Sequence, residues 1–277
     1  MPVRSPACSR RVAVVLCAVI WSAAPAGAQT LGGVRPVPHA PPARGVLTAW
    51  HTTLDAVHLA GSDAGPRFDW DIDFRFDADL IDLGFVRANV LAQVETIVGS
   101  ELRDVDPNQN NYTADFTLFF RLPRGELGAM FHHVSRHLAD RADQGSISWN
   151  MVGVSYDERF TVGPARVDAG VRAMGTTERA GVDYTAQVEW YGALELPLNP
   201  RLAIIGMADG VVAPVERGMF GRGARRGGRL AGGVRIPSAA GAVDLYAGWE
   251  QRIDAGQFTR ETTRWLQAGV RMTVPAP

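Results

Sequence analysis

The chain has 277 residues, a formal net charge of −1 and 46% hydrophobic residues, values that suit many ordinary domains. No basic tract points to nucleic acid, and no run of 18 apolar residues after the N-terminal segment suggests a membrane-spanning helix. Composition and charge therefore argue against a nucleic-acid-binding protein and a helical membrane protein, and they leave the fold open.

The first 28 residues have the pattern of a secretory signal peptide. Arg4, Arg10 and Arg11 precede an apolar run over 12–24, and Ala26-Gly27-Ala28 is typical of a cleavage site. The alternative, a membrane anchor, is disfavoured because the apolar run is too short to span ~30 Å of hydrocarbon comfortably. We expect the mature chain to begin at residue 29 and to contain no cysteine, since both cysteines precede that position.

A proline-rich segment over 29–44 follows the predicted signal peptide. Its composition is typical of an extended or flexible leader. No second globular domain is indicated further along the chain. The sequence therefore predicts three parts, which are a signal peptide over 1–28, a leader over 29–44 and one domain over 45–277.

Strict alternation of apolar and charged residues over 67–77 is the strongest structural signal. The aromatic and aliphatic residues Phe68, Trp70, Ile72, Phe74 and Phe76 fall on one face, and charged residues occupy the other. A strand of this kind needs an apolar medium on one side and a polar one on the other. The same pattern returns over 182–190 and over 265–274. Repeated alternation of this kind is typical of a transmembrane β-barrel.

Twelve strands are expected in all. They cover residues 45–56, 67–77, 82–95, 111–122, 126–138, 147–157, 163–174, 181–195, 200–209, 228–237, 241–251 and 262–274. Short connections alternate with long polar ones, as periplasmic turns alternate with outer loops in such barrels. A soluble barrel or sandwich is the alternative, but the signal peptide and the charges deep within the strands disfavour it. We therefore predict an all-β, antiparallel up-and-down barrel of 10 to 12 strands in the outer membrane of a Gram-negative envelope.

The polar face of the predicted strands carries charges of both signs. Interleaved aspartates, glutamates and arginines can cross-link the inside of a barrel of this size, whereas a wide aqueous channel usually needs more strands. The sequence therefore predicts a filled lumen and disfavours a general diffusion pore.

Candidate chemistry is concentrated in residues 131–140. Half of the six histidines lie within 132–137, where His133, Ser135 and His137 share one face of the expected strand. If this face points outward, His133 and Ser135 lie at the level of the outer-leaflet head groups, which favours lipid chemistry. If it points inward, the residues belong to a lumen network or a narrow pore.

The next strand supplies an amide. It begins at Ser146-Ile147-Ser148-Trp149-Asn150, and pairing Leu138 with Ile147 would place Ser135 directly opposite Asn150. The His-x-Ser pair followed by Ser-x-Ser-Trp-Asn resembles the outer-membrane phospholipase A family of twelve-stranded barrels. The resemblance implies that His133 is the base, Ser135 the nucleophile and Asn150 the group that orients the histidine.

Two further resemblances concern the same stretch. The His-x-Ser pair is also similar to that of the lipid A deacylase barrels. The longer stretch from His133 to Asp140 resembles a His-x-Ser-Ser-His-Leu-Gly-Asp motif of uncharacterised outer-membrane barrels, in which His137 and Asp140 would lie near the site. The resemblance to that family implies the barrel fold but no particular activity.

Cofactors and partners follow from these resemblances. Calcium is the one cofactor that the phospholipase resemblance implies, and outer-membrane lipids are the expected partners. His133 and His137 are about 13 Å apart on a strand, too far to share one ion, and the metal ligands stay unknown. The function hypothesis is lipid acyl-ester hydrolysis, and the alternative is a non-catalytic envelope barrel, structural or a narrow pore. The sequence alone leaves open whether the barrel is an enzyme and whether it forms oligomers.

Overall fold

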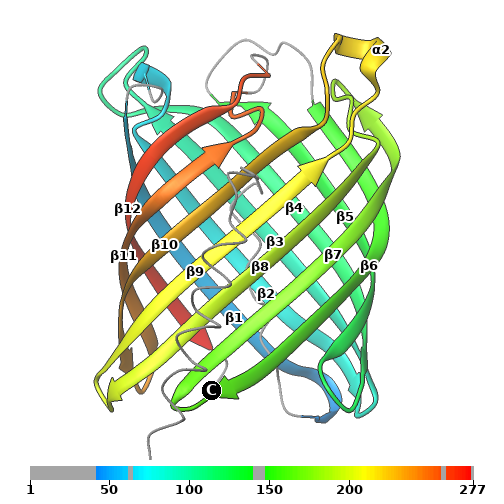
Figure 1. The fold of residues 1–277 in the computed structure, drawn as a ribbon, viewed down its shortest axis with the longest axis vertical. Helices are drawn as coiled ribbons and strands as arrows, with labels where there is room; N and C mark the ends of the chain where they lie inside the picture. Colours follow the sequence, from blue (N-terminus) through cyan, green and yellow to red (C-terminus); the bar gives the residue numbers. More distant parts are fainter. Residues whose placement is uncertain (1–41, 62–64, 140–146, 257–259, 276–277) are drawn as a thin grey trace, which may run out of the picture.

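The computed structural model describes residues 42–61, 65–139, 147–256 and 260–275. The predicted signal peptide and most of the predicted leader lie outside these ranges. Twelve antiparallel strands form a closed barrel in which β1 pairs with both β2 and β12 (Figure 1). The strands are β1 (Arg44–Ala60), β2 (Trp70–Leu83), β3 (Val86–Gly99), β4 (Asp106–Arg121), β5 (Glu126–Leu138), β6 (Ile147–Val162), β7 (Ala165–Ala180), β8 (Ala186–Asn199), β9 (Leu202–Ala213), β10 (Arg225–Ser238), β11 (Gly241–Arg252) and β12 (Thr263–Pro275). The barrel predicted from alternation is confirmed.

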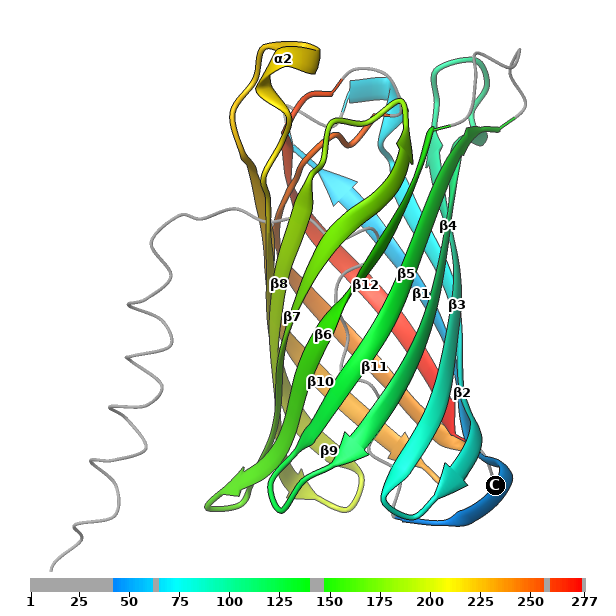
Figure 2. The ribbon, with the colours of Figure 1, turned by 90° about the vertical axis from the view of Figure 1, so that its right-hand side faces the viewer.

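Long and short connections lie at opposite ends of the barrel, as expected. The short turns, such as residues 163–164 and 239–240, share one end with both ends of the described chain (Figures 1 and 2). The other end carries the longer connections, with the short helices η1 (Gly65–Arg67) and α2 (Arg217–Phe220). None of the helices within the described residues is long and apolar enough to cross a membrane. We call the two ends the turn end and the loop end, which correspond to the periplasmic and outer ends in barrels of this type.

Several predicted strands begin later than expected, and β8 is delayed the most. The alternation over 181–195 predicts a strand from residue 181, but β8 begins at Ala186. Val182, Asp183 and Tyr184 are all buried in succession, which a strand with alternating faces does not allow. Gly181, with a φ of 72°, ends β7 and lets the chain turn inward. These residues therefore lie in the mouth of the barrel instead of facing outward.

The outer surface and the lumen differ sharply in polarity. On β2, Trp70 and Phe74 are 43% and 49% exposed on the outward face, whereas Asp73 on the inward face is only 3% exposed. Large apolar side chains are exposed in the same way along the other strands. An outward apolar belt around a polar interior is the surface that a lipid bilayer requires of a barrel.

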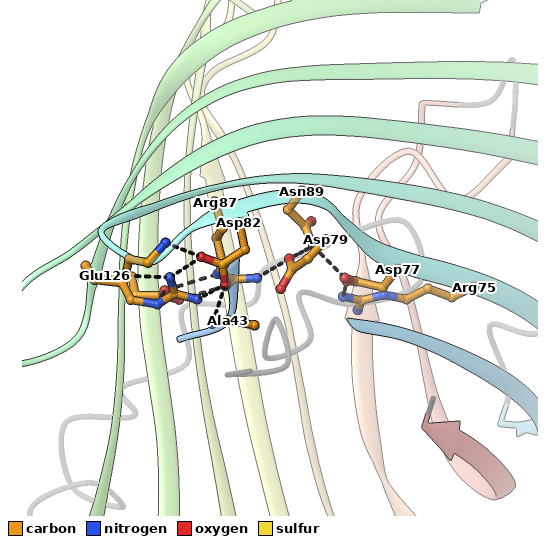
Figure 3. A network of polar contacts seen from close by, with 10 residues as sticks. Ala43, Arg75, Asp77, Asp79, Asp82, Arg87, Asn89 and Glu126 are labelled. Atoms are coloured by element: carbon orange, nitrogen blue, oxygen red, sulfur yellow. Dashed lines mark hydrogen bonds and ion pairs between the residues drawn. The ribbon is translucent and has the colours of Figure 1, made fainter. Parts of the chain in front are cut away.

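Ion pairs fill the lumen. Arg87 donates to Asp79 and to Glu126 across the interior, and Asn89 donates to both Asp77 and Asp79 (Figure 3). All five side chains are buried. Because a buried charge is costly unless it is paired, this mutual pairing is what allows so many charges inside. The filled lumen predicted from the mixed charges is confirmed in this part of the barrel.

The described residues line two cavities in the lumen. One of about 60 Å³ lies toward the loop end, and its lining includes His132, Trp149 and Tyr184. The other, of about 280 Å³, lies toward the turn end, and its lining includes Arg159 and Arg235. Arg75 and Tyr191 line both cavities and therefore lie between them.

Candidate active site at the outer rim

The orientation of β5 separates the candidate residues into two groups. His132, Val134 and Arg136 point into the lumen, where they are between 1% and 4% exposed. The alternate residues His133 and Ser135 are half-buried on the outward face, and His137 is exposed there. The sequence left open which face these residues occupy, and the outward face is the one that favours lipid chemistry.

His132 belongs to the lumen network. Its Nδ1 lies 2.6 Å from Asp115 Oδ1, and the other oxygen of Asp115 accepts a hydrogen bond from Arg172. The ring is therefore held on the opposite side of the barrel wall from Ser135. His133, its neighbour in sequence, is the histidine available to the outer surface.

The register between β5 and β6 differs from the predicted one. Leu138 does not pair with Ile147; Arg136 does, so that Ser135 is opposite Ser148 and His133 is opposite Asn150. The prediction was wrong by two residues. A shift of two preserves the inward and outward faces, so the alternation of side chains did not distinguish the two registers. The observed register brings the amide to the histidine instead of to the serine.

A chain of hydrogen bonds joins three strands on the outward face. His133 Nδ1 on β5 lies 2.6 Å from Asn150 Oδ1 on β6, and Asn150 Nδ2 donates to Glu178 Oε2 on β7 at 3.0 Å. Ser135 follows His133 on the same face, and its hydroxyl makes no hydrogen bond within the part of the chain that the structure describes. The arrangement therefore contains the histidine and its orienting amide in contact, with a hydroxyl free beside them.

The site lies at the upper edge of the apolar belt. Toward the turn end on the same outward face, Phe131, Val152 and Val154 are 41%, 50% and 55% exposed. Toward the loop end, the ring of His137 contacts Tyr112 edge-on at 5.6 Å between centroids. Asp140, the other residue expected near the site, lies outside the described residues. On this outward face, exposed side chains therefore change from apolar to polar at the level of His133 and Ser135.

No set of calcium ligands is gathered around the site within the described residues. Ca²⁺ takes six to eight oxygen ligands, whereas the carboxylate beside Asn150 is that of Glu178 and already accepts a hydrogen bond. No group of three or more His, Cys, Asp or Glu side chains within the described ranges is arranged to hold a metal ion. We therefore derive no catalytic step through calcium.

A closed antiparallel barrel with an apolar belt and a polar interior defines an outer-membrane β-barrel. Solved structures support this class. Outer membrane phospholipase A from Escherichia coli is 13% identical over 81% of this chain and 92% of that chain, with a TM-score of 0.50. An outer membrane channel from Pseudomonas putida F1 is 10% identical over 86% of this chain and 99% of that chain, with a TM-score of 0.51.

These similarities concern the fold alone, because one neighbour is an enzyme and the other a channel at comparable scores. A third structure is a Salmonella typhi outer membrane phospholipase dimer with bound calcium, 12% identical over 86% of this chain and 94% of that chain. Its TM-score of 0.49 is too low for its calcium or its dimer to bear on this chain. No family model matches the sequence, and no curated protein matches it.

Proposed function

We propose that this protein is an outer-membrane serine hydrolase that cleaves acyl esters of outer-leaflet lipids. The observation that carries the proposal is the hydrogen bond between His133 and Asn150 on the outward face, with Ser135 beside it. A serine next to a histidine that a third group orients is the arrangement that activates a hydroxyl for attack.

The roles of the three residues follow from their atoms. When Asn150 Oδ1 accepts a hydrogen bond from His133 Nδ1–H, the proton of the neutral ring is on Nδ1 and Nε2 has a free lone pair. His133 Nε2 is then the base, Ser135 Oγ the nucleophile, and Asn150 the group that holds the ring in place. The resemblance to the phospholipase A family assigns the same roles.

The reaction proceeds through an acyl-enzyme. Ser135 Oγ attacks the ester carbonyl carbon while its proton passes to His133 Nε2, and the tetrahedral intermediate expels the lysolipid oxygen, which takes that proton. Water then attacks the acyl-serine with His133 again acting as base, and the fatty acid leaves. Ser135 and His133 are two residues apart on one face, about 7 Å between Cα atoms, so a rotation of the side chains brings them together. Catalytic hydrogen bonds commonly close only when substrate binds.

The position of the site selects the substrate class. Ester carbonyls of phospholipids and of lipid A lie at the boundary between head groups and acyl chains, which is the level of Ser135. Both lipids present the same acyl-ester chemistry, so the assay must distinguish them. An outer-membrane location and lipid partners are part of this proposal.

Substitution of the three residues tests the proposal. Purified refolded protein is assayed for fatty-acid release from mixed micelles of phospholipid or of lipid A, with and without calcium. Ser135→Ala and His133→Ala should lower the rate roughly a thousandfold or more, because they remove the nucleophile and the base. Asn150→Ala should lower it less, roughly tenfold to a hundredfold, because an orienting hydrogen bond is lost.

His137→Ala is the matched control, since His137 lies on the same face of β5 outside the proposed triad. It should keep the activity of the parent, and all variants should stay heat-modifiable as folded barrels do. A parent protein that releases no fatty acid under any of these conditions would leave the non-catalytic envelope barrel as the function. Full activity in Ser135→Ala would show that Ser135 is not the nucleophile and would overturn the proposed site.

A further inference from the structure

Glu178 is the outward carboxylate that contacts the proposed site, and its position depends on a β-bulge. Asn150 pairs with Glu178, whereas the next residue, Met151, pairs with Thr176. Thr177 is therefore an extra residue in β7, and its hydroxyl donates to the backbone oxygen of Asn150 at 3.2 Å. One inserted residue reverses the faces of the strand beyond it.

The reversal brings Glu178 to the site. Below the bulge the even-numbered residues point inward; Arg172, for example, donates to Asp115 and Glu189 in the lumen. Without the extra residue, Glu178 would continue that inward series. With it, Glu178 faces outward and accepts the hydrogen bond from Asn150 Nδ2 at 3.0 Å. Bulges that redirect a single side chain are common next to active sites.

The Asn150 amide has two orientations, and they differ in chemical consequence. In the first, Oδ1 faces His133 and accepts from Nδ1–H, which leaves Nε2 free to act as base. In the second, Nδ2 faces His133 and donates to Nδ1, which places the ring proton on Nε2 and removes the base. A primary amide by itself has little preference between the two.

An ionised carboxylate distinguishes these orientations because it only accepts hydrogen bonds. In the first orientation Asn150 Nδ2 donates to Glu178. In the second the amide oxygen would lie against the carboxylate, which is repulsive. We infer that Glu178 is a positioning residue of the proposed hydrolase, fixing the Asn150 amide and through it the Nδ1-protonated tautomer of His133. This inference rests on the proposed function and extends its site to a fourth residue.

Kinetics of paired variants test the inference. Glu178→Ala should lower kcat for fatty-acid release roughly tenfold to a hundredfold, with little change in KM, because the lost hydrogen bond acts on the base and not on lipid binding. Glu178→Gln should lower kcat by an intermediate factor, because its amide can accept from Asn150 but can also donate to it, which weakens the preference for one orientation. The matched control is Glu158→Ala, which removes an outward carboxylate at the turn end, hydrogen bonded to Tyr156, and should match the parent.

The Asn150→Asp background should cancel the effect. In that background the side chain of residue 150 has no N–H to donate, and Glu178 faces a second carboxylate. Glu178→Ala in that background should leave kcat unchanged or raise it. A fall as large as in the parent background would show that Glu178 acts through folding or lipid contact and would overturn the inference.

A spectroscopic measurement separates this inference from the proposed function. The ¹⁵N chemical shifts of the His133 ring, assigned by difference from His133→Ala and followed over a pH series until they show the neutral ring, report the tautomer. The parent should show the Nδ1-protonated form, and Glu178→Ala should lose that preference. An unchanged tautomer in Glu178→Ala overturns the inference even if the parent is active. A tautomer that does change in a protein that releases no fatty acid supports the positioning role while refuting hydrolysis.

Discussion

His132 and His133 show how strand geometry decides what a residue can do. The two are adjacent in sequence, yet one contacts Asp115 in the lumen and the other contacts Asn150 on the outer surface. An inward histidine paired with a buried carboxylate is a structural element of the lumen. An outward histidine beside a free hydroxyl has access to lipid, so the proposed chemistry belongs to His133.

Arg222 fixes three loops at the mouth of the barrel. It reaches from the loop after α2 and forms ion pairs with Asp183 and Asp254, while Tyr184 donates to Asp254 as well. Burial by itself would raise the pKa of the Asp254 carboxyl, but the hydrogen bonds from Arg222 and Tyr184 outweigh burial and lower it below the ordinary value. A lowered pKa in the folded state means that the ionised form stabilises the folded mouth.

The pH dependence of this contact is a prediction with a definite sign. The stabilisation from Asp254 should be complete above the ordinary carboxyl pKa of about 4 and should be lost as the pH falls through the lower folded-state value. Asp254→Asn should therefore lower the temperature of heat modification relative to the parent at pH 7. The difference should shrink progressively below about pH 4, where the parent also loses the charge. The other carboxylates titrate equally in both proteins, so only Asp254 can make the difference in heat-modification temperature depend on pH. A difference that stays constant between pH 7 and pH 3 would contradict this account.

The candidate site was predictable from the sequence in part. The spacing of His133 and Ser135 and their shared face follow from the period of a strand, and Asn150 follows from the resemblance. The contact between Asn150 and Glu178 could not be predicted in this way. It depends on a bulge in β7, which the alternation of residues does not reveal before the pairing of β6 with β7 is known. The register between β5 and β6 is likewise one that alternation left open.

At the scale of elements, alternation was sufficient to predict the number and order of the strands, because each one separates an apolar surface from a polar lumen and so needs period two. The bounds of several strands, such as β2, β3 and β4, differ from the prediction by several residues. Alternation failed at Val182 and Tyr184, where apolar residues have the right spacing but pack inside the mouth with Trp149 and other apolar side chains. The spacing of residues predicts which side chains share one face of a strand. It does not indicate whether that face points outward or into the interior.

The outward face of β12 provides a test of membrane burial. Val270 lies near the middle of this strand, is 46% exposed and faces outward, with Leu266 and Met272 on the same face. Val270→Arg should cost ~2–4 kcal/mol of folding free energy in lipid, as for an arginine at the bilayer midplane. Val270→Leu should cost little. Unfolding of the refolded protein in vesicles by denaturant measures both. Equal stability of the two variants would contradict a lipid-facing β12.

At the scale of the whole molecule, side chains of the described residues fill the lumen at two levels. The mouth holds an apolar cluster that includes Met130, Trp149 and Ile253, above which Arg222 joins the loops. Midway, Arg75 and Tyr191 lie between the two cavities, with Tyr191 donating to Asp157 at 2.6 Å. Within the described residues, contacts at the mouth involve loops, whereas the side chains in the middle are held by strands.

This difference predicts where the barrier to ions lies. The larger cavity opens toward the turn end, because the exposure of its arginines rises from 9% at Arg271 through 27% at Arg235 to 44% at Arg159. Solute entering from that end should therefore stop at Arg75 and Tyr191. In planar bilayers the parent should show no sustained conductance, and Arg222→Ala should show none either, since releasing the loops leaves the middle closed.

Replacing both Arg75 and Tyr191 by alanine should have a different effect on the conductance. Arg75→Ala combined with Tyr191→Ala removes the side chains between the cavities, while Asp77 and Asp157 keep hydrogen bonds from Asn89 and Ser155. This double variant, combined with Arg222→Ala, should conduct measurably more than Arg222→Ala alone in matched preparations. A sustained conductance in the parent would instead favour the narrow-pore function, and an Arg222→Ala variant that conducts by itself would place the barrier at the mouth.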